Sequence, residues 1–126
     1  MAYVLRAVLG SPAVVTQAGE PLPLDQGLAL VRIPPDLRLG DTDNRTLEAW
    51  SAAGPIAYVE AEYFAGTGSQ FAVVCAGGDL VLGPLVQDED DPPTHPTPIS
   101  QALRHLGAIP GGHFDEFDAV GLGRYR

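Results

Sequence analysis

Apolar residues that favour strands are concentrated in the middle of the chain, between Pro55 and Val86. Three runs rich in Val, Tyr, Phe and Ile, at residues 56–64, 70–75 and 80–85, are separated by two glycine turns. Such side chains suit a pleated, half-buried surface, and short turns favour antiparallel neighbours. The pattern therefore predicts a three-stranded β-meander around which the rest of the chain is organised.

Two further apolar runs lie nearer the N-terminus. Residues 3–9 alternate loosely and residues 27–33 are largely apolar, so both are predicted to be strands. Residues 20–26, which lie between them and contain two prolines, are predicted to be a loop. Together with the meander, these runs predict an antiparallel sheet of four to five strands.

Two or three short helices are expected to cover this sheet. Ser11 and Pro12 form an N-cap and first-turn pair that can open a short helix. Asp43 or Asn44 can cap a second helix that ends near residue 52. Residues 98–106 predict the clearest helix, because its apolar positions recur at helical spacing. These positions are Ile99, Ala102, Leu103 and Leu106. We expect the 44–52 and 98–106 helices to pack mainly on one face, giving an α+β fold.

The length of 126 residues and the 45% hydrophobic content predict a single globular domain over residues 1–126. No apolar run approaches the roughly 18 residues of a membrane helix, and the N-terminus lacks a basic leader. A cytoplasmic location is therefore expected. The one cysteine, Cys75, lies in an apolar run, which predicts a buried and unreactive thiol rather than a disulfide or zinc ligand.

Charge gives the strongest functional hint. The net charge is −9, and residues 60–118 alone contain ten acidic residues and one arginine. Nucleic acid is disfavoured as a partner, because phosphate contact requires clustered basic side chains. A basic protein partner is the expectation, with solubility as the alternative explanation of the acidity. All seven basic residues are arginine, which, with abundant Ala, Gly and Pro, indicates a GC-rich bacterial genome.

Glu60 and Glu62 are the first candidate site residues. They lie two apart on a predicted strand and therefore project from the same face. Paired carboxylates can act as acid and base or hold a cation, and Tyr63 or Tyr58 could assist them. The alternative is that this face is the wet side of an antiparallel sheet.

A second candidate is the acidic run formed by Asp88, Glu89, Asp90 and Asp91. It lacks the alternate ligand spacing and the glycine of a calcium loop, so a solvated loop that attracts a basic protein is favoured. The three histidines, His95, His105 and His113, show no metal-binding spacing. No metal, cofactor or catalytic residue is assigned.

The glycine-containing segment Gly66–Ser69 could suggest a phosphate-binding loop. It joins two predicted strands and lacks the Gly-Lys-Ser/Thr ending of a P-loop, so a hairpin turn is the favoured interpretation.

Three segments carry a resemblance to a group of small, acidic bacterial proteins without an assigned activity. They are residues 58–70, residues 98–107 and residues 115–126. The resemblance implies no catalytic residues. In size and acidity the chain is also similar to toxin-immunity proteins.

The sequence thus predicts a non-enzymatic protein-binding module, inhibitor-like or immunity-like, that meets a basic partner. One alternative is a small enzyme or ligand-binding domain that uses Glu60 and Glu62 beside the Gly66–Ser69 segment. Another is a structural subunit of an oligomer. The sequence leaves the oligomeric state open.

Overall fold

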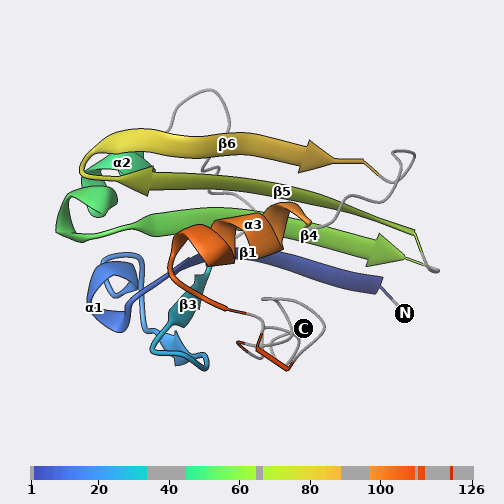
Figure 1. Cartoon of the computed structure of the whole chain (residues 1–126), viewed down its shortest axis with the longest axis horizontal. Coiled ribbons are helices and arrows are strands. Elements are labelled where there is room, and N and C mark those ends of the chain that lie inside the picture. Colours follow the sequence, from blue (N-terminus) through green and yellow to red (C-terminus); the bar gives the residue numbers. More distant parts are fainter. Residues whose placement is uncertain are drawn as a thin grey trace.

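A computed structural model describes residues 2–33, 45–64, 67–88, 97–109, 111–112 and 120. Its centre is one antiparallel sheet of six strands in the order β2-β3-β1-β4-β5-β6. The helices pack against this sheet, so the fold class is α+β as the sequence predicts (Figure 1).

The predicted meander is confirmed as the strands β4 (Ile56–Phe64), β5 (Thr67–Ala76) and β6 (Asp79–Gln87). Adjacent strands are antiparallel, and Gly77 and Gly78 turn the chain between β5 and β6 with positive φ angles of 61° and 89°. A left-handed backbone of this kind favours glycine. The glycine signal therefore located this hairpin correctly.

The N-terminal strand β1 (Ala2–Gly10) lies inside the sheet, between β3 (Ala29–Arg32) and β4. Its register with β4 runs from Ala2 opposite Phe64 to Gly10 opposite Ile56. Placing the first strand beside the meander brings residues near the N-terminus against the middle of the chain.

The sixth strand is β2 (Leu22–Pro23), which lies within the segment predicted to be a loop. It pairs with β3 through Leu22 opposite Leu30, at the edge of the sheet. The prediction of four to five strands was one short, because two residues beside prolines carry no recognisable strand pattern.

The predicted 98–106 helix is confirmed as α3 (Pro98–His105), which lies across the sheet in Figure 1. Thr97 is its N-cap, and its hydroxyl accepts the backbone N–H of Ser100 at 3.4 Å. Ile99, Ala102 and Leu103 are fully buried in the core cluster that also contains Leu5, Val59 and Val74. The helical spacing of these residues produces the apolar stripe that docks α3.

The two short helices α1 (Pro12–Val15) and α2 (Arg45–Trp50) contribute to a second core cluster. A 3-10 turn over Ser51–Ala53 follows α2. Val14, Val15 and Leu47 pack there with Tyr58 and Cys75, which alternate along β4 and β5 with residues of the α3 cluster. The expectation that the 44–52 and 98–106 helices share one face is therefore wrong.

The physical reason lies in the central strands. In β1, consecutive residues Ala7, Val8 and Leu9 are all fully buried. Because successive side chains on a strand point to opposite faces, both faces of the sheet centre must be covered.

Candidate functional site

On the sheet face covered by α1 and α2, the side chains of β4 change from buried and largely apolar to acidic and more exposed. Ile56 and Tyr58 are buried, whereas the next residues on that face, Glu60 and Glu62, are half-buried and exposed. Side chains on one strand face recur at every second residue, so this change marks where the apolar cover ends. Beyond it, the sheet presents a surface of mixed charged and apolar side chains.

Cross-strand register arranges these side chains in two rows. In one row, Arg6 on β1 lies opposite Glu60 on β4, which lies opposite Phe71 on β5, which lies opposite Val86 on β6. In the next row, Val4 lies opposite Glu62, which lies opposite Ser69. We call this surface the mixed face. It comprises Val4, Arg6, Glu60, Glu62, Ser69, Phe71, Val86 and Asp88.

A half-open hollow of about 230 Å³ lies in the mixed face. Leu5, Ala61 and Gln70 complete its lining. Its lining residues come from four strands and from Asp88, which directly follows β6. The structure thus brings the two predicted glutamates and the first residue of the acidic run to one place.

Two of the lining residues, Arg6 and Glu60, form an ion pair. The Nε of Arg6 lies 3.7 Å from Oε1 of Glu60, and the two side chains are 33% and 38% exposed. At this exposure water screens the pair, which therefore contributes little to folding stability. Its consequence is local, because Arg6 offsets part of the charge of Glu60.

Phe71, which lines the hollow, also contacts the buried ring of Tyr58. Its ring meets that of Tyr58 edge to face, with centroids 6.3 Å apart and an interplanar angle of 64°. Tyr58 itself is only 1% exposed. Tyr58 therefore shares the strand face of the two glutamates but lies beneath the helices, and it does not line the hollow.

The other predicted site residues have different outcomes. Tyr63 belongs to β4, opposite Gly68, but its side chain lies outside the described part of the chain. Glu89, Asp90 and Asp91 lie wholly outside it.

The Gly66–Ser69 segment is mostly strand. Thr67, Gly68 and Ser69 belong to β5, and Gly66 lies outside the described residues. Ser69 acts as a short side chain in the mixed face rather than as part of a phosphate-binding loop.

Cys75 is buried, as predicted. Burial, together with the negative charges of Glu48 and Asp79, raises the pKa of its thiol from 9.0 to about 11. The thiolate is the reactive species, so this cysteine is protonated and inert near neutral pH.

Among the histidines, His105 is exposed on α3, and the other two lie outside the described residues. Within the part of the chain that the structure describes, no three His, Cys, Asp or Glu side chains gather to hold a metal ion. No helix among the described residues is long and apolar enough to span a membrane.

The sequence analysis did not identify four residues of the mixed face: Val4, Arg6, Phe71 and Val86. Arg6 carried a usable signal, since it is the one charged residue in an otherwise apolar strand. Its position opposite Glu60 could not be read without knowing that β1 pairs with β4.

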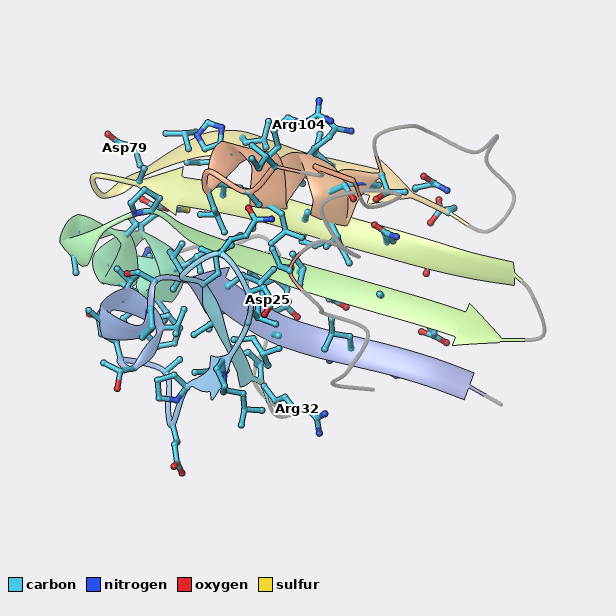
Figure 2. All side chains as sticks on the ribbon, turned by 60° about the horizontal axis from the view of Figure 1, so that its bottom comes forward. Asp25, Arg32, Asp79 and Arg104 are labelled. Atoms are coloured by element: carbon cyan, nitrogen blue, oxygen red, sulfur yellow. The ribbon has the colours of Figure 1, made fainter. Side chains whose placement is uncertain are left out.

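The charged residues that Figure 2 labels lie elsewhere. Arg32 and Arg104 are exposed on β3 and α3 and point away from the sheet. Asp79 lies at the turn between β5 and β6, at the opposite end of those strands from Ser69 and Val86. Of the arginines in the described part of the chain, Arg6 lines the hollow.

Comparison of the chain with protein-family models, with curated proteins and with solved structures finds no match.

Proposed function

We propose that this chain is a non-enzymatic binding module, inhibitor-like or immunity-like, that meets a basic partner protein through the mixed face. The observation that carries the proposal is the gathering of Glu60, Glu62 and Asp88 around one hollow on the sheet, beyond the residues that pack with α1 and α2. Among the described residues that line the hollow, Arg6 is the one basic side chain. A surface of this sign attracts a basic protein and steers its approach.

The net charge of −9 supports the same proposal on a larger scale. In the sequence, three further acidic residues follow Asp88, which lines the hollow. An excess of negative charge of this size favours the approach of a basic protein.

A small enzyme or ligand-binding domain is the second candidate, favoured by the presence of both glutamates in one hollow. The half-exposed setting of the Arg6–Glu60 pair leaves water in contact with these carboxylates. Strong electrostatic catalysis works best where water is excluded. The binding role accounts for this open geometry more simply.

A pull-down from cell lysate, in which the chain captures a partner protein, tests the proposal. Wild-type protein and the variant Glu60→Gln/Glu62→Gln serve as baits, each at about 0.15 M and about 1 M salt, where the screening length falls from about 8 Å to about 3 Å. A matched control is Glu20→Gln/Asp79→Asn, which removes the same charge from two exposed residues outside the mixed face.

We expect the wild type and the control to retain a basic protein at the lower salt concentration, and the Glu60/Glu62 variant to lose it. A captured protein that is not basic, or that both variants retain equally, would contradict the proposal.

A further inference from the structure

The strands at the two ends of the sheet order carry features that disfavour pairing with another strand. The end strand β2 has two residues, one of them Pro23. At the other end, β6 contains Gly83 and Pro84, and its pairing with β5 shifts register twice, between Ala72 and Cys75. Short strands, prolines and bulges are features that disfavour edge-to-edge pairing. Strand addition at β2 and β6 is therefore disfavoured relative to contact through the mixed face.

On the mixed face, the hollow has a clear steric origin. Ser69 lies opposite Glu62, and the next strand passes it where Gln87 pairs with Gln70, one residue before Asp88. The short side chain of Ser69 on β5 therefore lies between the longer side chains of Glu62 and Asp88, which line the same hollow. The backbones of Glu62 and Asp88 are separated by about two strand spacings, or about 10 Å.

Apolar side chains line the hollow together with the charged ones. Val4 and Val86 are each 57% exposed, and the Phe71 ring is half-buried. A long side chain with an aliphatic stem and a cationic end matches this combination of apolar and acidic lining residues.

Arginine fits better than lysine. A guanidinium is planar, pairs with a carboxylate through two hydrogen bonds and stacks on an aromatic ring such as that of Phe71. Arg6 already offsets part of the charge of Glu60. Within the described lining of the hollow, the acidic side chains of Glu60, Glu62 and Asp88 still outnumber this one basic side chain.

From these observations we infer that the hollow over Ser69 receives an arginine side chain of the basic partner, which docks on the mixed face. This inference rests on the proposed function and specifies the group that is recognised.

Nuclear magnetic resonance titration with a defined probe tests it. The probe is acetyl-arginine amide, and the matched probe is acetyl-citrulline amide, which has nearly the same shape and no charge. Acetyl-lysine amide distinguishes a guanidinium site from a general cation site. We expect the arginine probe alone to shift the backbone amides of Glu62, Ser69 and Phe71 strongly.

The variant Ser69→Val fills the hollow without changing the charge of the mixed face, and valine suits a strand. We expect it to weaken binding of the arginine probe by at least about tenfold. Equal shifts with citrulline or lysine, or unaltered binding to Ser69→Val, would overturn the inference.

The two proposals can fail separately. If the arginine probe leaves the hollow's amides unmoved while Glu60→Gln/Glu62→Gln still loses the captured partner, the inference fails and the proposed function stands. If the probe binds as expected but no basic protein depends on the two glutamates, the proposed function fails.

Discussion

The side chain of Gln70 on β5 accepts the backbone N–H of Ile99 at 3.0 Å, which ties the start of α3 to the sheet. Gln70 is only 7% exposed, so this bond lies in the protein interior. Gln70→Leu would leave a buried N–H without its acceptor and should cost about 1–3 kcal/mol of unfolding free energy. Urea denaturation measures the change, and an unaltered midpoint would show that α3 docks through its apolar stripe alone.

The two core clusters, one on each face of the sheet, predict that a cavity in either one destabilises the protein. Leu103 and Leu47 are both fully buried but belong to separate clusters. Leu103→Ala and Leu47→Ala should each cost about 2–5 kcal/mol of unfolding free energy through lost burial and a residual cavity. Thermal denaturation of the two variants tests this. If only Leu103→Ala destabilised the protein, the second cluster would not be a true core.

A buried charge at residue 103 tests the packing of α3 more severely than a cavity does. Leu103→Asp would bury an unpaired carboxylate in the α3 cluster and should prevent stable folding. Arg104→Asp serves as the control, because residue 104 is exposed. A melting temperature of Leu103→Asp equal to that of the control would rule out the packing described for α3.

Gly83 on β6 approaches β5 closely. A Cβ at this position would lie 2.6 Å from the carbonyl oxygen of Ala72, and the φ angle of +93° is one that other residues rarely adopt. Gly83→Ala should therefore destabilise the protein by more than about 1 kcal/mol. Gly77→Ala is a useful comparison, since its Cβ would meet no atom within 4 Å and only the backbone strain remains. Equal losses in the two variants would argue against the close approach at Gly83.

The thiol of Cys75 predicts a specific dependence of stability on pH. Its pKa is about 11 in the folded protein against 9.0 when unperturbed, because burial disfavours the thiolate. The unfolded chain therefore loses this proton first, and the contribution of Cys75 to stability is complete below pH 9 and declines as pH rises toward 11.

Urea denaturation between pH 7 and pH 10 measures that decline, with Cys75→Ala as the control that lacks the thiol. The wild type should lose more stability than the control above about pH 9, the unperturbed value. Parallel pH profiles would contradict the buried, protonated state.

Much of the fold could be predicted because the signals were local. Gly77 and Gly78 fixed the hairpin, and Ile99, Ala102 and Leu103 fixed the buried side of α3. The predictions that failed concerned contacts between residues far apart in the sequence. No single run reveals that Leu22 pairs with Leu30, or that Leu47 and Leu103 lie on opposite faces.

The candidate site divides in the same way. The shared face of Glu60 and Glu62 follows from the period of a strand, and the sequence therefore predicted it. The contributions of Arg6 and Val86 depend on which strands are neighbours, and that is decided by the packing of the whole chain. Hence the carboxylates were found but the hollow was not.

The two glutamates should be nearly dispensable for folding. Glu62 is exposed and Glu60 has a screened partner in Arg6. Glu60→Gln/Glu62→Gln should change the unfolding free energy by less than about 1 kcal/mol. This measurement also validates the capture experiment, because a large loss of stability would mean that the variant tests folding rather than recognition.

The central claim is that acidity recruits a basic partner, and the association rate tests it most directly. The captured partner is mixed with the wild type and with a variant in which Asp88, Glu89, Asp90 and Asp91 are changed to their amides, at low and high salt. The account predicts that the wild-type rate falls steeply with salt and that the amide variant is slower at low salt, with unchanged folding stability. A rate that is indifferent both to salt and to the four amides would contradict it.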